Sequence, residues 1–118
     1  MKIQLKRAYD APSKSDGTRI LVDRLWPRGL TIAKAEIDLW LKEIAPSSEL
    51  RKWFHREAEG KDWKEFRRRY LAELKNHRDE IDLLRSKTQQ GPVTLIYSAR
   101  DREQNHAVIL KGILERAV

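Results

Sequence analysis

The sequence predicts a single α/β domain with a small, mostly parallel sheet of about four strands flanked by helices. Two runs of consecutive apolar residues, RILVDRL (19–25) and VTLIY (93–97), are typical of strands covered on both faces. Between and after these runs the apolar spacing changes to three or four residues, which indicates helices. Strands that alternate with helical segments favour a parallel sheet. No repeat or long linker divides the chain, so we expect one domain over residues 1–118.

The remaining strands are expected on either side of the first long run. Residues 2–6 alternate apolar and charged or polar side chains, which is the pattern of a half-buried strand. Residues 10–17 (DAPSKSDG) are rich in turn formers and predict a loop. Residues 37–44 (IDLWLKEI) are interpreted as a strand, although Trp40 and Ile44 also fit helical spacing.

Two helices are expected in the middle of the chain, before a third short one. Ser47 can cap the first of them, and Asp62 can cap a helix over 61–76. A short break centred on Gly60 separates the two. Along 61–76, one face is apolar and aromatic and the opposite face is basic. A third, short helix is expected over 81–85.

The last helix is expected to follow the strand at 93–97. Asp101 and Gln104 have the spacing of a capping box, which would start the helix there. The stripe expected to face the core comprises Ala107, Leu110, Leu114 and Ala117.

Cysteine content and hydropathy exclude several classes of protein. The 118 residues include no cysteine, which rules out disulfides, thiolate zinc sites, iron–sulfur clusters and cysteine nucleophiles. Three histidines cannot easily make a metal site, so we expect no metal and no cofactor. No apolar run approaches the roughly 20 residues that cross a bilayer, and the N-terminus lacks a signal-peptide pattern. We therefore expect a cytoplasmic protein without a membrane partner.

The charge of the chain favours anionic partners. The formal net charge is +7, the isoelectric point is about 9.9, and 36% of the residues are charged. A positive field attracts phosphates and nucleic acids without selecting among them. The same composition also suits a surface that only keeps the protein in solution.

A candidate site lies where the two long strands end. Ligands of open parallel sheets bind outside the carboxyl ends of the strands, and LVDRLWPRG (21–29) and LIYSARD (95–101) are two such ends. If the strands are neighbours, the two segments face each other across one cleft. The residues predicted to bind an anionic ligand there are Arg24, Trp26, Arg28, Tyr97, Ser98 and Arg100.

Each type of residue in this set has a chemical role and a structural alternative. Arginine binds phosphate or carboxylate with two parallel hydrogen bonds, and Trp26 can stack on a ring or anchor a turn. Asp23 and His106 are the candidates for proton transfer, but Asp23 can equally form a structural ion pair with an arginine. Ser98 can bind a ligand or cap the last helix. Whether the protein is an enzyme stays open.

The other interpretation is a non-catalytic nucleic-acid-binding module. Its contacts would come from the basic helix face, which comprises Lys61, Lys64, Arg68 and Lys75. An interaction subunit for another protein is a third possibility. The chain contains no GxGxxG, GxxxxGK[ST], HExxH or GxSxG motif, so dinucleotide-binding, P-loop, zincin and serine hydrolase assignments have no support.

Three segments together resemble one known family. RILVDRLWPRG (19–29), IDLWLKEIAPSSELRKWF (37–54) and VTLIYSARDREQNHAVILK (93–111) are similar, in this order, to the YeaO-like branch of the DUF488 family. The resemblance covers nearly the whole chain and implies a small bacterial or archaeal cytoplasmic α/β domain. The recurring DRLWPRG of the family corresponds to residues 23–29, and its YSA-basic-D segment to residues 97–101, with Asn105 and His106 following. Broader relatives can carry a cysteine near this last region. This chain has no cysteine, so it cannot share a mechanism that depends on a thiol.

Overall fold

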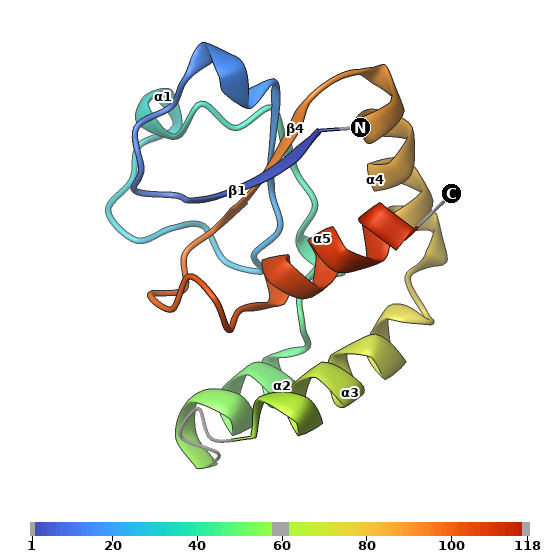
Figure 1. Ribbon diagram of the computed structural model, residues 1–118. Helices are drawn as coiled ribbons and strands as arrows, with labels where there is room; N and C mark the ends of the chain where they lie inside the picture. The colour runs from blue at the N-terminus through green and yellow to red at the C-terminus, as the bar shows by residue number, and fades with distance from the viewer. Residues whose placement is uncertain (1, 58–61, 117–118) are drawn as a thin grey trace.

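The computed structural model of the chain (Figure 1) describes residues 2–57 and 62–116 and contains one four-stranded sheet. The strands lie in the order β1-β4-β2-β3, and all three neighbouring pairs are parallel. They are β1 (Ile3–Arg7), β2 (Thr18–Leu21), β3 (Leu39–Trp40) and β4 (Val93–Tyr97). This confirms the predicted α/β class and the parallel sheet of four strands.

The two apolar runs form the two central strands. Every residue of β4 is buried, because β1 and β2 pair with it on either side. Successive side chains of a strand point to opposite faces, so Leu95 joins the main core while Ile96 lies on the other face. Runs of consecutive apolar residues are required here because both faces of the sheet are covered.

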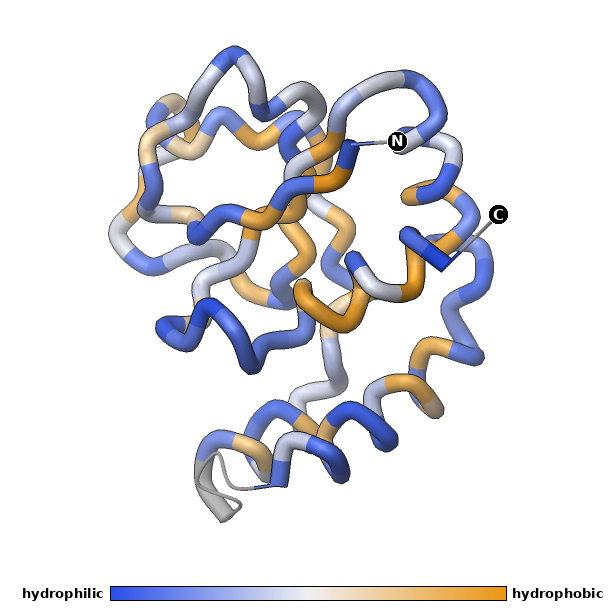
Figure 2. The backbone as a smooth tube through the Cα atoms, viewed as in Figure 1, coloured by the Kyte–Doolittle hydropathy of each residue, from blue (hydrophilic) through white to orange (hydrophobic). Residues whose placement is uncertain are grey.

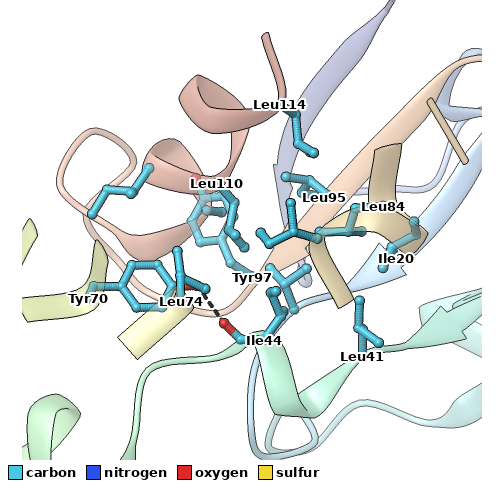
Figure 3. Packing of buried hydrophobic residues seen from close by; sticks show 14 of the residues in the cluster. Ile20, Leu41, Ile44, Tyr70, Leu74, Leu84, Leu95, Tyr97, Leu110 and Leu114 are labelled. Atoms are coloured by element: carbon cyan, nitrogen blue, oxygen red, sulfur yellow. Dashed lines mark hydrogen bonds between the residues drawn. The ribbon is translucent and has the colours of Figure 1, made fainter. Parts of the chain in front are cut away.

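Three helices cover one face of the sheet. They are α3 (Trp63–Leu74), α4 (Arg78–Gln90) and α5 (His106–Arg116). Figure 3 shows leucines of α4 and α5, with Tyr70 and Leu74 of α3, packed around Leu95 and Tyr97 of β4. The hydroxyl of Tyr70 donates a hydrogen bond of 2.6 Å to the carbonyl oxygen of Ile44 (Figure 3), which connects α3 to the chain after β3. Figure 2 shows the same organisation as apolar colour on the strands and on parts of the helices.

Two tryptophans, Trp26 from the loop after β2 and Trp40 from β3, cover much of the opposite face. Leu21 and Ile96 are buried there beneath Trp26 and Trp40, whose ring centroids lie 5.6 Å apart in an edge-to-face arrangement. The only helix among the described residues before β3, apart from a 3-10 turn, is the four-residue α1 (Ile32–Ala35). The longer helices α3, α4 and α5 therefore all contribute to the core on the other face of the sheet.

The predicted caps are partly confirmed. Ser47 caps α2 (Ser48–Lys52), and Asp62 caps α3 through the amide of Glu65. The capping box predicted at Asp101 is wrong: its carboxylate accepts two local amides in a turn, and Asn105 caps α5 instead. An aspartate followed by polar residues stabilises a turn as readily as a helix start, since its side chain bonds nearby amides in both.

Several boundaries differ from the prediction. Only Leu39–Trp40 of segment 37–44 pairs as a strand, and a 3-10 turn over Lys42–Ile44 follows it. Helix α4 extends well beyond 81–85, because its polar residues are compatible with a helix until Gly91. The expectations for Gly60, Lys61 and Ala117 lie outside the described residues.

A buried ion cluster fixes the amino end of the sheet. Asp16 is 1% exposed and lies 2.8 Å from Nζ of Lys6 and 2.6 Å from Nη1 of Arg19. Arg19 also donates to the carbonyl oxygens of Ala35 and Glu36. Burial by itself raises the pKa of Asp16, but hydrogen bonds from Lys6, the Ser13 amide and Arg19 outweigh it, so the pKa lies below its ordinary value.

Candidate functional site

The two charged strand ends are neighbours in the structure. Strands β2 and β4 pair in parallel, with Leu21 opposite Ile96, and the next amide, of Val22, donates to the carbonyl oxygen of Ile96 at 3.0 Å. The segments that leave these strands therefore start side by side at one edge of the sheet. The sequence left this adjacency open, and the predicted site depended on it.

A pocket of about 430 Å³ opens between these segments and the chain around α2. We call it the cleft. The residues of the predicted site that line it are Asp23, Arg24, Trp26, Arg28, Ser98, Arg100 and His106. Its size falls within the range of pockets that bind small molecules, roughly 300–1,000 Å³.

Tyr97 does not share this location. Its side chain is 2% exposed and belongs to the main core beneath α5 (Figure 3). Burial raises the pKa of its hydroxyl above the ordinary value. Alternation along β4 turns its side chain inward, towards the helices, so the structure places Tyr97 in the core and not in the cleft where a ligand contact was predicted.

Asp23 and His106 contact each other at the inner end of the cleft. Nε2 of His106 lies 3.2 Å from Oδ1 of Asp23 and 2.9 Å from the carbonyl oxygen of Val22. Because a carbonyl oxygen only accepts, Nε2 must carry a hydrogen. The pair thus connects the end of β2 to the first residue of α5. The hydrogen on Nε2 goes to the carbonyl oxygen of Val22, and Oδ1 of Asp23 has no hydrogen-bond partner among the described residues.

The start of the loop after β4 is held from two sides. The amide of Ser98 donates to Oδ2 of Asp23 at 2.9 Å. Arg7, the last residue of β1, donates from Nη2 to the carbonyl oxygen of Ser98 and from Nε to that of Ala99. Ser98 is therefore fixed by its backbone and does not cap α5, since Asn105 does so. Its buried hydroxyl has no hydrogen-bond partner among the described residues.

Arginine side chains dominate the charge of the cleft. Arg24 is oriented by two backbone acceptors: its Nη2 donates to the carbonyl oxygen of Ala45 at 3.1 Å and its Nε to that of Pro46 at 3.3 Å. Arg28 and Arg100 are exposed at the edges of the cleft. Trp26 is both an anchor and a wall, because Nε1 donates to the carbonyl oxygen of Leu30 while the ring lines the cleft.

The structure adds cleft residues that the sequence analysis did not select. Arg51, Phe54 and His55 line the cleft from α2 and the π-helical turn after it (Trp53–Glu57). π-helical turns occur frequently at functional sites. The signal was present, because Arg51 and His55 are four residues apart and share a helix face. Burial, then the charges of Arg51 and His106, lowers the pKa of His55.

The resulting electrostatics favour an anion. Among the residues that the structure describes, four arginines and one aspartate line the cleft, a net charge of +3 with the histidines neutral. Among the side chains of residues 2–55 and 62–116, no carboxylate oxygen lies within 4.0 Å of these arginines. The one carboxylate in this described lining, that of Asp23, contacts the Ser98 amide and His106.

The basic helix face is less available than its sequence indicates. Lys64, Arg68 and Lys75 are exposed on or just after α3. However, Arg68 donates two hydrogen bonds to Glu65, and Arg69 donates a third. The hydrogen bonds from Arg68 and then Arg69 lower the pKa of Glu65 to about 2, so the acid stays ionised beside them.

The described residues show no cluster of three or more histidine, aspartate or glutamate side chains suited to a metal ion. None of their helices combines the length and the apolar character that spanning a membrane requires.

Comparison with known proteins identifies the family. The model of a family described as the inactive DUF488-N3 subclade matches residues 2–118. The chain belongs to the DUF488 family. It is 52% identical over 110 residues to "Uncharacterized protein YeaO" of Escherichia coli (strain K12), which covers 93% of this chain and 94% of that protein. It is 35% identical over 113 residues to "Uncharacterized protein Rv3073c" of Mycobacterium tuberculosis, and the aligned residues cover 96% of this chain and 93% of that protein. No solved structure matches.

DUF488 membership confirms the resemblance seen in the sequence motifs. In this DUF488 chain, the DRLWPRG segment (23–29) and the YSARD segment (97–101) start side by side at the ends of β2 and β4. Together they supply most of the charged residues of the cleft. The motifs that carry the resemblance and the candidate site are thus the same part of the molecule.

Proposed function

We propose that this protein binds a small phosphate-bearing ligand, a nucleotide or a nucleic-acid end, in the cleft, with Arg24, Arg28 and Arg100 holding the phosphate. The observation that carries the proposal is the gathering of four arginines without a carboxylate partner, among the described residues, around one pocket. Surface arginines are usually interspersed with acids, so an unbalanced group around a concave site favours an anionic ligand.

Arginine geometry supports phosphate as that anion. A guanidinium presents a planar set of donors that matches two oxygens of a phosphate, and it stays charged at all physiological pH values. Arg24 is already oriented by the carbonyl oxygens of Ala45 and Pro46, so binding would cost it little conformational entropy. Nη1 of Arg24 takes no part in these two hydrogen bonds, so it can donate to a ligand. Arg51, across the cleft on α2, adds a fourth positive charge.

The site supports binding better than turnover. The candidates for proton transfer, Asp23 and His106, are engaged with each other, with the Ser98 amide and with the Val22 carbonyl oxygen. The chain has no cysteine nucleophile, and the matching family model is described as an inactive subclade. We therefore propose that Asp23 and His106 position the loops of the cleft while the arginines hold the ligand.

The test is calorimetric titration of the protein with inorganic phosphate, ribose 5-phosphate and a nucleoside 5′-monophosphate. The key variant is Arg100→Gln, at an exposed cleft position, and the matched control is Arg78→Gln, an exposed arginine at the start of α4. Losing a charged hydrogen bond costs about 1.5–3 kcal/mol, so the affinity of Arg100→Gln should fall about tenfold or more. The control should bind like the unmodified protein.

Absence of binding by every phosphate, or equal losses in both variants, would refute the proposal. Product analysis after prolonged incubation checks turnover, and intact ligand is expected. The nucleic-acid module on α3 predicts a different result: binding of long oligonucleotides with a steep salt dependence that Lys64→Ala and Arg68→Ala reduce. The pairing of Arg68 with Glu65 does not favour that outcome.

A further inference from the structure

We infer that the cleft recognises a phosphate ester that carries a flat aromatic ring, a mononucleotide, and that Tyr9 and Leu25 at its rim contact that ring. This inference rests on the proposed binding of a phosphate in the same cleft. It assigns ligand-contacting roles to two residues outside the arginine set, and it narrows the proposed ligand from a nucleotide or a nucleic-acid end to a mononucleotide.

The first observation is where exposed apolar side chains occur. Among the described residues, four large hydrophobic side chains are exposed: Tyr9, Leu25, Ile32 and Leu83. Two of the four, Tyr9 and Leu25, line the cleft. Tyr9 is 47% exposed and Leu25 is 61% exposed, so each leaves much apolar surface in water beside the arginines. Burying that surface against a ligand is favourable, whereas a bare inorganic anion would leave it exposed.

The second observation is that the ring of Tyr9 is held in place. Its hydroxyl donates a 3.0 Å hydrogen bond to the carbonyl oxygen of Arg28, and the guanidinium carbon of Arg7 lies 5.2 Å from its ring centroid. A fixed aromatic ring loses little conformational freedom when another ring stacks on it. The bond also places this ring next to the backbone of a phosphate-binding candidate, Arg28. An aromatic surface and a cation are thus adjacent at one rim.

Leu25 has no structural reason to be exposed. It lies between Arg24 and Trp26, and the side chain of each of these neighbours is anchored by hydrogen bonds to the backbone. Trp26 packs into the smaller core while Leu25 points away from it and lines the cleft. A leucine at such a position contributes nothing to the folded core, and a polar residue would be compatible with the turn. Its contribution is an apolar contact at the cleft.

Charge and size then select the class of ligand. Aromatic rings of nucleobases stack on aromatic side chains without regard to base identity, at about 1–3 kcal/mol per base, or roughly 5- to 150-fold in affinity. The volume of about 430 Å³ suits one small ligand rather than an extended strand. The positive charge of the cleft suits a phosphate and its apolar rim suits a base. A mononucleotide is a small ligand that carries both groups.

The test compares ligands that differ only in the ring. Adenosine 5′-monophosphate and ribose 5-phosphate are titrated by calorimetry into the unmodified protein and into Leu25→Ala, Tyr9→Ala and Tyr9→Phe. Ile32→Ala is the matched control, because Ile32 is 80% exposed and does not line the cleft. Thermal unfolding of each variant checks that it folds.

We expect adenosine 5′-monophosphate to bind at least about fivefold more tightly than ribose 5-phosphate. Leu25→Ala and Tyr9→Ala should reduce this ratio, because they remove contacts to the ring. Tyr9→Phe keeps the ring and loses only the hydrogen bond to Arg28, so it should reduce the ratio less than Tyr9→Ala, and Ile32→Ala should preserve the ratio. Equal affinities for the two ligands, or a ratio insensitive to both alanine variants, would overturn the inference while leaving the phosphate site intact. No binding of either ligand would overturn both proposals. Tight binding of oligonucleotides alone would also overturn it, in favour of a polymer.

Discussion

Oδ1 of Asp23 lies 3.2 Å from Nε2 of His106, and this contact joins the end of β2 to the start of α5 at the inner end of the cleft. The other carboxylate oxygen of Asp23 accepts the Ser98 amide, so one side chain organises both loops and the last helix. A group with two such contacts is a positioning residue, and its replacement should change stability before it changes any chemistry.

Asp23→Asn should destabilise the protein by about 1–3 kcal/mol. The amide group offers one acceptor oxygen, whereas two N–H groups lie against this carboxylate. The Ser98 amide donates to Oδ2, and Nε2 of His106, whose hydrogen goes to Val22, lies 3.2 Å from Oδ1. In either orientation of the new side-chain amide, its NH2 group therefore faces one of these two N–H groups, with no acceptor between them. Denaturant unfolding measures the effect, with Asp82→Asn, an exposed position on α4, as the control. Unchanged stability of Asp23→Asn would contradict this account of the pair.

Asp16→Asn should be among the most destabilising conservative substitutions in the chain. Removing one charge of a buried pair costs about 3–5 kcal/mol, because Arg19, which is 4% exposed, is left without its counter-charge. The measurement is again unfolding by denaturant. A cost like that of an exposed aspartate would show that the carbonyl oxygens around Arg19 compensate on their own.

The same carboxylate predicts how stability depends on pH. The folded-state pKa of Asp16 is below its ordinary value, so the unfolded chain binds the proton more readily. The stabilisation that ionised Asp16 contributes is therefore fully present above the pKa of this group in the unfolded chain, near 4. It is lost as the pH falls towards the lower pKa of the folded state. Unfolding free energies between pH 6 and pH 3 should fall less steeply in Asp16→Asn than in the unmodified protein. Parallel pH profiles would contradict the assignment.

Gly17→Ala should destabilise far more than Gly29→Ala. Both glycines have positive φ angles, 66° and 78°, so both substitutions strain the backbone, and the ψ of −137° at Gly17 adds to the strain there. A Cβ at residue 17 would also meet the carbonyl oxygen of Pro92 at 2.2 Å, whereas residue 29 has no atom within 4 Å of that position. Comparing the two melting temperatures measures the added cost of strain and overlap at residue 17. Equal losses would show that the backbone near Pro92 moves aside.

Ligand binding in the cleft should be coupled to proton uptake at His55. Burial, Arg51 and His106 lower its pKa in the free protein, and a bound anion opposes the effect of these positive groups. The other charged groups that line the cleft are Asp23, Arg24, Arg28 and Arg100. Affinity should therefore increase as the pH falls through the ordinary range of histidine, with up to about one proton taken up per anion.

Calorimetry in two buffers with different ionisation enthalpies measures this proton uptake directly. His55→Gln should remove it, whereas His77→Gln should retain it, because His77 pairs with Glu80 at the start of α4. Titration of the phosphate itself is the same for all variants, so it cancels in the comparison. Equal uptake in His55→Gln and the unmodified protein would refute the role of His55.

Local pattern and composition were sufficient to predict the fold class. The runs 19–25 and 93–97 contain consecutive apolar residues because both faces of β2 and β4 are covered, and that requirement is visible in the sequence itself. The caps at Ser47 and Asp62 were also predicted, since they depend on residues only three positions apart. The family membership follows from the same motifs.

The sequence by itself thus determined the parallel α/β class, the family and the two segments where a site was to be sought. Only the tertiary structure decided that β2 and β4 are neighbours, that Tyr97 faces the core, and that Arg51, His55 and Tyr9 line the same cleft as Arg100. The physical reason is range: strand patterns and caps depend on neighbours along the chain, whereas the cleft is formed by residues from separate segments of the chain that meet only when the whole core packs.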